Sequence, residues 1–414
     1  SFFCTLNNEY VPSKTLYVDK NGYVWVGTQR GLYIMNPETE EYSHFTNSKS
    51  DIFTLPSNSV WTIEEDAQKN VWIGTYSGGL CYLNFQETSR FRTFSPRENG
   101  LNHKVVSGFA EDDESLWIAT EGGGVNRMNK KTGEFRYYTH NPSRNSLTYD
   151  NVKSLVIDPS QNLWVAMYRG GLDCFSHKTS AFKRFNKDYR SDNGMLTNDL
   201  RKIILEADSG LWISYQSTGI SFYSFATDRF THYMSKRDNN NSSISDLCRG
   251  KGDDLWVVNN EELYYMNVRT KEYRKIAPDS TYSLRAQALC LDETGNVWIG
   301  TVGSGLVRYA VKNNRFYSVN DILRYDVSTI YSLCTDDDND LWMGTDNGLF
   351  KYNIEKNIFF RFDKKDGIQG IVFYPKACMK GKNGELYFGG TNGFTIINPK
   401  EVLLSEFKPT AIII

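Results

Sequence analysis

The sequence predicts an all-β fold built from nine similar repeats, and three observations support this prediction. One short motif, an aliphatic residue followed by an aromatic, an aliphatic and a small residue, recurs along the whole chain of 414 residues. The strand-favouring residues Tyr and Phe are frequent, with 26 and 24 copies. The 32 glycines and 10 prolines indicate many turns, whereas helical periodicity is absent.

One aromatic residue anchors each repeat. The anchors are Trp25, Trp72, Trp117, Trp164, Trp212, Trp256, Trp298, Trp342 and Tyr387. Successive anchors lie 42 to 48 residues apart. In the fourth repeat, we expect residues 152–158, 162–168, 172–177 and 181–186 to form four strands joined by short turns.

Four strands per repeat at this spacing are typical of a β-propeller, in which each repeat forms one blade. The anchor is expected to fill the space between blades, and a small residue two positions later, such as Gly300, lets the next sheet approach. Val258 departs from this pattern. An acidic residue six positions before most anchors is expected to bind the backbone of the following turn. These residues are Asp19, Asp66, Glu111, Asp158, Glu206, Asp292 and Asp336.

Nine repeats allow two arrangements. The first is one closed ring of nine blades, in which residues 1–6 pair with the last blade, because that blade has no clear fourth strand of its own. The second is a seven-bladed ring from about Leu101 onward plus two blades that belong to another ring. We favour the first, because two separate blades would expose apolar faces and strand edges. Residues 1–400 would then form the propeller, and residues 401–414 an exit segment.

Composition excludes several classes of function. The formal net charge is −2 with acidic and basic residues well mixed, so neither a nucleic acid nor a membrane surface is an expected partner. No apolar run is long enough to span a bilayer. Since the chain begins at Ser1 without a signal-peptide pattern, we expect a mature product or part of a longer protein.

The seven cysteines are expected to be mostly buried free thiols. Cys248, Cys290 and Cys334 lie eight residues before their anchors, and Cys378 lies nine before. Equivalent positions on sheets packed about 10 Å apart are too distant for a disulfide. We therefore expect neither disulfides nor a metal cluster among them.

No motif in the sequence indicates a catalytic site, a cofactor site or a metal site. The five histidines show no zinc-binding spacing, and no nucleophile-elbow pattern is present. Residues 335–342, TDDDNDLW, resemble a calcium loop in composition but lack its central Gly and distal Glu. Paired carboxylates from different blades remain an open alternative, because a propeller glycosidase would draw them from several repeats.

Two sets of positions vary between repeats and are candidates for ligand binding. The second turn of each blade lies on the same face as the linkers between blades, and its candidates are Gln29, Arg30, Tyr76, Glu121, Tyr168, Arg169, Tyr215, Gln216, Asn259, Asn260, Glu261, Asp346 and Asn347. The second set lies eleven residues before the anchors, near the mouth of the central channel, and comprises Lys14, Trp61, Val106, Lys153, Arg201, Ser245, Gln287 and Tyr331.

Tyr rings, Arg side chains and amides suit a sugar, which needs a flat apolar surface and planar hydrogen bonding. At the channel mouth, a ring of Trp61, Lys153, Arg201 and Tyr331 would suit an anionic or stacking ligand. The alternative is that the turns are simply solvated and that the inner side chains fill the channel.

The pattern D-x-x-G-N-x-W-I-G-T followed by G-L, as in residues 292–306, resembles the two-component-regulator propeller repeats. Residues 138–158 resemble the family's linker between blades, and residues 384–402 resemble its closing blade. Residues 408–414, KPTAIII, resemble the entry to an immunoglobulin-like domain. The family usually has seven blades per ring, which nine copies do not match.

The resemblance implies the periplasmic sensor part of a hybrid two-component system of Bacteroides-type bacteria. It implies a non-enzymatic domain that binds a glycan-derived oligosaccharide or another small polar ligand and signals to a histidine kinase. A homodimer is expected in the full-length receptor, with a membrane helix outside this sequence. The alternatives are a propeller glycoside hydrolase or lyase, and a protein-interaction scaffold with an apolar patch.

Overall fold

The chain folds into two units, Ser1–Ser89 and Arg90–Ile414, and each is described by itself. The computed structural model describes residues 3–6, 9–47, 54–66, 70–84, 91–187, 194–234, 243–276 and 284–402. The predicted exit segment therefore lies almost entirely outside the described residues. Among the residues that are described, no helix has the length and apolar character needed to cross a membrane.

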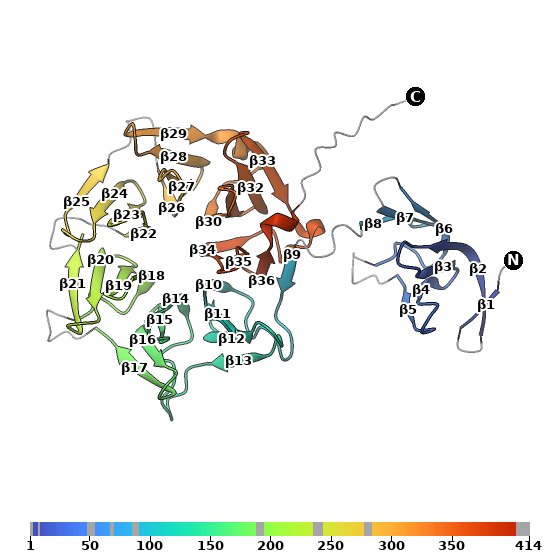
Figure 1. Ribbon diagram of the computed structural model, residues 1–414, viewed down its shortest axis with the longest axis horizontal. Helices are drawn as coiled ribbons and strands as arrows, with labels where there is room; N and C mark the ends of the chain where they lie inside the picture. Colours follow the sequence, from blue (N-terminus) through green and yellow to red (C-terminus); the bar gives the residue numbers. More distant parts are fainter. Residues whose placement is uncertain are drawn as a thin grey trace. The chain divides into compact units, whose positions relative to one another are not determined.

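The larger unit contains seven four-stranded antiparallel sheets arranged in a ring (Figure 1). We use the word channel below for the axis on which their inner strands converge. Blades 1 to 3 are β10 (Val106–Glu111), β11 (Ser115–Thr120), β12 (Val125–Asn129) and β13 (Phe135–Tyr138); β14 (Val152–Ile157), β15 (Leu163–Met167), β16 (Gly171–Ser176) and β17 (Ala181–Phe185); and β18 (Leu200–Glu206), β19 (Gly210–Tyr215), β20 (Ile220–Ser224) and β21 (Arg229–Tyr233).

Blades 4 to 6 follow the same order. They are β22 (Ile244–Arg249), β23 (Asp254–Asn259), β24 (Leu263–Asn267) and β25 (Tyr273–Ile276); β26 (Ala286–Leu291), β27 (Val297–Thr301), β28 (Leu306–Ala310) and β29 (Arg315–Val319); and β30 (Ile330–Thr335), β31 (Leu341–Thr345), β32 (Leu349–Asn353) and β33 (Ile358–Phe362). The four predicted strands of the fourth repeat agree with β14 to β17 to within two residues.

Blade 7 combines strands from the two ends of the larger unit. It consists of β34 (Phe373–Lys380), β35 (Leu386–Gly390), β36 (Gly393–Ile397) and, as its outer strand, β9 (Phe91–Phe94). Short 3₁₀ helices connect or follow strands at η3 (Asn320–Tyr325), η4 (Lys364–Asp366) and η5 (Pro399–Glu401).

The ring closes after seven blades. The inner strands β10, β14, β18, β22, β26, β30 and β34 contact one another in turn, and β34 contacts β10. The favoured single ring of nine blades, and with it the single propeller over residues 1–400, is therefore wrong. The seven-bladed ring of the alternative is observed, and the first two repeats lie in the smaller unit; that they belong to another ring stays a prediction. The strand that completes the last blade is also not the predicted one. Residues 1–6 were expected there, but Phe3–Leu6 pairs within the smaller unit and β9 completes blade 7. We call the pairing of β9 with blade 7 the clasp.

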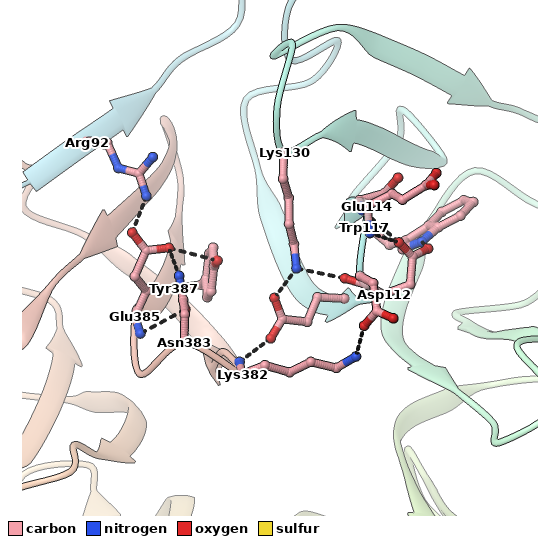
Figure 2. Close-up of polar contacts among 12 residues, drawn as sticks. Arg92, Asp112, Glu114, Trp117, Lys130, Lys382, Asn383, Glu385 and Tyr387 are labelled. Carbon is pink, nitrogen blue, oxygen red and sulfur yellow. Dashed lines mark hydrogen bonds and ion pairs between the residues drawn. The ribbon is translucent and has the colours of Figure 1, made fainter.

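Side chains reinforce this clasp. Phe94 of β9 stacks on Phe394 of β36, with ring centroids 4.7 Å apart and planes within 4°. Figure 2 shows Arg92 bonded to Glu385 and the Lys382 loop of blade 7 bonded across to blade 1. The Lys382 ammonium lies 2.6 Å from a carboxylate oxygen of Asp113. Both the outer strand and these ion pairs therefore join the end of the ring to its beginning.

The smaller unit contains two sheets. The first is five-stranded, with β1 (Phe3–Leu6), β2 (Glu9–Val18), β3 (Val24–Thr28), β4 (Gly31–Met35) and β5 (Tyr42–Phe45). The second is three-stranded, with β6 (Val60–Glu65), β7 (Asn70–Thr75) and β8 (Gly79–Asn84). Its anchor Trp72 is 38 % exposed, whereas Trp117 of the closed ring is fully buried. Within the described part of this unit, no third sheet covers that face.

The anchors confirm the predicted role of packing between blades, and they add a bond that the sequence analysis missed. In blade 2, the Asp158 carboxylate accepts from the backbone N–H of Asn162 at 2.8 Å and from the indole N–H of Trp164 at 2.9 Å. Equivalent acid–indole bonds join six other pairs: Asp19–Trp25, Asp66–Trp72, Asp112–Trp117, Glu206–Trp212, Asp292–Trp298 and Asp336–Trp342. In blade 1 the acid is Asp112 rather than the predicted Glu111, because that turn is one residue shorter.

The small residue after each anchor faces the next blade, as expected. A Cβ on Gly300 of blade 5 would lie 2.7 Å from a methyl carbon of Ile330 in blade 6, and one on Gly389 of blade 7 would lie 2.6 Å from the Val106 carbonyl of blade 1. Neither contact leaves room for a larger residue. Blade 7 therefore packs against blade 1 in the same way as neighbouring blades pack elsewhere in the ring, with a small residue at the contact.

The described cysteines are free thiols, as predicted. Burial raises the pKa of the Cys174 thiol to about 12 and that of the Cys248 thiol to about 11. Thiols of this kind are poor nucleophiles at neutral pH and act as small apolar side chains.

Candidate functional site

A β-bulge near the start of each inner strand places one extra residue at the channel. In blade 2 the register shifts between Val152 and Ser154, which leaves Lys153 as the extra residue. The same shift occurs at Ser107, Arg201, Ser245, Gln287 and Tyr331. Five of these positions were predicted eleven residues before the anchor. In blade 1 the predicted Val106 is wrong, because Ser107 occupies the bulge and Val106 is fully buried.

Blade 7 has a larger bulge, which the sequence analysis missed. Phe373 pairs with Gly390 and Cys378 with Phe388, so four residues of β34 face one residue of β35. Lys376 within this bulge has a φ of +62°, in the left-handed region that a side chain with a Cβ seldom adopts. Figure 1 shows β34 at the centre of the ring, among the other inner strands.

The bulge of β34 reaches blades 1 and 2. The Tyr374 hydroxyl donates to Oε1 of Glu121 in the second turn of blade 1, at 2.7 Å. The Lys153 ammonium of blade 2 lies 2.5 Å from the same carboxylate oxygen and 3.2 Å from the Tyr374 hydroxyl. Lys153 also lies 5.6 Å from the ring centre of Tyr168 and 5.8 Å from that of Tyr374. Three of the predicted site residues, Glu121, Lys153 and Tyr168, are therefore brought together.

Blades 3 and 4 supply the other charged groups. The Arg201 guanidinium donates from Nε to the side-chain oxygen of Gln216 at 2.6 Å and from Nη1 to the Ile244 carbonyl at 3.0 Å. The Lys202 ammonium lies 2.7 Å from Oδ1 of Asp246, whose other oxygen accepts from the backbone N–H of Leu289 at 2.9 Å. Arg201 and Gln216 were predicted, whereas Lys202 and Asp246 were not.

Electrostatics tie these residues into one cluster, which we call the channel cluster: Glu121, Lys153, Arg201, Lys202, Asp246, Tyr374 and Lys376. Burial lowers the pKa of Lys376 to about 8, and the charges of Arg201, Lys202 and Lys153 contribute to this shift although Asp246 opposes it. Burial also lowers the pKa of Arg201. Burial opposes the charge on Lys202, yet its pKa is raised because of Asp246. Four cations thus face two carboxylates.

Two second-turn candidates have structural roles instead. Tyr215 is fully buried in the core of blade 3, so it is wrong as a surface contact. It stands three residues after its anchor, where blades 1, 5 and 6 have a buried Thr whose hydroxyl binds the turn, as at Thr120. Asn259 occupies the same position, and its side-chain oxygen accepts from the backbone N–H groups of Glu261 and Glu262 at 2.9 and 2.6 Å.

The remaining ring candidates make no hydrogen bond or ion pair with the channel cluster among the described residues. Asp346 accepts from the backbone N–H groups of Ser328 and Thr329 at 3.0 and 3.1 Å, which fixes the linker before blade 6. Arg169 is exposed and lies over the Tyr168 ring at 5.1 Å. Glu261 is exposed, and Tyr331 is partly buried at its bulge.

The smaller unit places three of its candidates together. Trp61 and Tyr76 stack with ring centres 5.3 Å apart, and the Lys14 ammonium lies 5.1 Å from the Trp61 ring. Tyr76 is 72 % exposed and Trp61 49 %. Arg30 is exposed, with its backbone N–H bonded to the Thr28 hydroxyl. This unit thus presents an exposed aromatic pair rather than a cationic cluster.

Two aspartates of the calcium-like segment, residues 335–342, contact the ammonium group of a lysine from β32. The Lys351 ammonium lies 2.9 Å from a carboxylate oxygen of Asp340 and 3.7 Å from one of Asp336. Asp336 also bonds the anchor indole of blade 6. Asp336 and Asp340 therefore have cationic or indole partners within the protein.

A family model for the two component regulator propeller matches residues 5–30, 54–77 and 325–347. These three segments are thus similar to two-component-regulator propeller repeats. Each segment contains one anchor, namely Trp25, Trp72 or Trp342. The observed fold explains the match, since each segment covers an inner strand and the strand paired with it.

The chain is also similar to a curated relative and to several solved structures. The chain is 26 % identical over 93 % of its length to Histidine kinase P4 of Formosa agariphila, but it spans only 29 % of that relative. Its fold is similar to the extracellular domain described as hybrid two-component system BT3049 of B. thetaiotaomicron, with a TM-score of 0.67, 22 % identity, and coverage of 94 % of this chain and 56 % of that one. Its fold is also similar to that of virginiamycin B lyase from Staphylococcus aureus, with a TM-score of 0.56 and 13 % identity. That match covers 74 % of this chain and 97 % of the lyase.

Proposed function

We propose that this chain is the ligand-sensing part of a hybrid two-component system and that it acts outside the cytoplasm, in the periplasm. The observation that carries the proposal is the repeat match together with the likeness of nearly the whole chain to the extracellular domain of such a system. The histidine kinase relative is consistent with signalling to a kinase encoded beyond this sequence.

The proposed ligand is a small polar molecule, in the first instance a glycan-derived oligosaccharide. Three features support it: a cluster of charged and hydroxyl groups from five blades at the channel, Tyr rings beside it, and an exposed aromatic pair in the smaller unit. Tyr and Trp rings can stack on a sugar face, while charged and amide groups fix its hydroxyls.

Signalling requires that the ligand bind one arrangement of the receptor better than another. We propose that the full-length receptor is a homodimer anchored by a membrane helix outside this sequence, and that the ligand shifts its arrangement. The chain itself would have no catalytic activity in this scheme.

Glycoside hydrolysis is the less favourable alternative because both carboxylates of the channel cluster already have partners within the protein. A hydrolase needs two carboxyl groups that face the substrate. Glu121 is bonded to the Lys153 ammonium and the Tyr374 hydroxyl, and Asp246 to the Lys202 ammonium and the Leu289 backbone N–H. Neither residue thus presents a free carboxyl group to a substrate.

The test is a thermal-shift and calorimetric screen of the full 414-residue chain against neutral and acidic oligosaccharides. We expect at least one to bind and to raise the melting temperature, since ligand at 100 times its Kd adds about 2.7 kcal/mol to stability. A folded sample that binds no saccharide contradicts the ligand class. A sample that cleaves one contradicts the non-catalytic role.

A further inference from the structure

Two cations of the channel cluster have no carboxylate partner. Lys153 is paired with Glu121 and Lys202 with Asp246, so the two carboxylates are already used. Arg201 bonds only an amide and a backbone carbonyl. Among the described residues, Lys376 has neither a hydrogen bond nor an ion pair.

These two residues have hydrogen-bond donors to spare for an anion. A guanidinium has five N–H groups, and the two hydrogen bonds of Arg201 use one at Nε and one at Nη1. An ammonium has three, and those of Lys376 are unused within the described protein. A carboxylate or sulfate accepts several hydrogen bonds at once and is bound well by Arg in a planar, bidentate manner.

The structure holds Lys376 in this position against two unfavourable effects. The backbone of Lys376 is in the left-handed region, which is strained for a residue with a Cβ. Its charge is partly buried beside Arg201, Lys202 and Lys153, and like charges repel in a region of low dielectric. Strained backbone and grouped like charges are both found at functional sites, and a bound anion would offset the repulsion between the cations.

We propose that Arg201 and Lys376 form an anion-binding site in the central channel and that the ligand is an acidic saccharide with a carboxylate or sulfate group. The acidic group binds between these two residues, and the sugar ring lies toward Tyr168 and Tyr374, whose rings flank Lys153. This inference rests on the proposed function and adds the charge of the ligand and the residues that bind it.

Arg201 comes from blade 3 and Lys376 from blade 7, which are separated by blades 1 and 2 on one side of the ring. A ligand bound by both would join opposite sides of the channel. The seven-bladed ring, rather than any single repeat, therefore creates the site.

The test uses calorimetry on the full chain with three probes: a disaccharide that contains glucuronic acid, the same disaccharide with its carboxylate reduced to an alcohol, and inorganic sulfate. The variants are Lys376→Met and Arg201→Gln, with Lys312→Met, an exposed lysine of blade 5, as the matched control. Circular dichroism verifies that each variant is folded.

We expect the acidic disaccharide to bind the wild-type protein and Lys312→Met equally. We expect each channel variant to bind it about 10- to 100-fold more weakly, the range for loss of a hydrogen bond to a charged group. The reduced disaccharide should bind the wild-type protein at least 10-fold more weakly than the acidic one.

Failure of the anion site and failure of the proposed function give different results. If the neutral disaccharide binds as well as the acidic one, or if both channel variants bind like the wild-type protein, the anion site is wrong while the sensor proposal stands. If sulfate binds through Arg201 and Lys376 and neither disaccharide binds, the saccharide assignment is wrong. If no probe binds and the wider screen of saccharides is also negative, the proposed function falls as well.

Discussion

Replacement of Lys376 by Met is expected to stabilise the protein at neutral pH. The pKa of Lys376 is lowered from 10.5 to about 8, so the folded ring disfavours the charged form that predominates in the unfolded chain. At about 1.4 kcal/mol per pH unit, this corresponds to an upper bound of about 3 kcal/mol. Met keeps the length of the side chain and the backbone strain, and removes the charge.

The stability gained by Lys376→Met must depend on pH in a defined way. Below pH 8, Lys376 is charged in both states and the full destabilisation is present. Between pH 8 and 10.5, the unfolded chain binds more protons than the folded one, so the stability contributed at this site rises with pH. The difference between variant and wild type should therefore be largest near pH 7 and vanish near pH 10.5.

Thermal unfolding followed by circular dichroism measures this difference. For a ring of this size, about 3 kcal/mol corresponds to roughly 4 °C in melting temperature. Lys312→Met, at an exposed position, should change little at any pH. A Lys376→Met protein that is less stable than the wild type at pH 7, or a difference that is the same at pH 7 and 10, would refute the reasoning.

Four further outcomes follow from the same contacts. Phe94→Ala should lower the free energy of unfolding of the ring by about 2 kcal/mol, and limited proteolysis should then cut near β9; unchanged protection would contradict the clasp. Asp292→Ala should cost about 2 kcal/mol at pH 7. Donors that include the Trp298 indole outweigh burial and hold the pKa of Asp292 below its usual range, so in denaturant titrations this contribution should be lost only below about pH 4. Glu121→Gln should tighten binding of the acidic disaccharide several-fold in calorimetry, because it releases a third cation; weaker binding would count against the site. Binding to the wild-type protein should weaken above pH 8, as Lys376 loses its proton; constant affinity to pH 10 would exclude its role.

The blades could be predicted from sequence because each depends on local signals. The anchor and the acid before it are close in sequence, and they define the turn and the packing of each blade in nearly the same way, as Asp158 and Trp164 do. The number of blades per ring could not be predicted in this way. It depends on which strand pairs with β36, and the answer is Phe91–Phe94, about 300 residues earlier.

The site was predicted where it follows the repeat and missed where it departs from it. Lys153 and Arg201 occupy the regular bulge, so their spacing from the anchors located them. Tyr374 and Lys376 lie in the longer bulge of β34, which has no counterpart in the other blades. The one signal was that Cys378 stands one residue further from its anchor than the other inner-strand cysteines. The prediction for Tyr215 was wrong because the second turn was expected to include it, whereas Tyr215 is the last residue of β19 and is fully buried.

A crystal structure of the full chain with the glucuronic-acid disaccharide tests the central claim most directly. We predict that the carboxylate lies in the channel of the seven-bladed ring, within hydrogen-bonding distance of the Lys376 ammonium and the Arg201 guanidinium. A disaccharide bound instead on the Trp61–Tyr76 pair of the smaller unit, or on the outer strands of the ring, would contradict it.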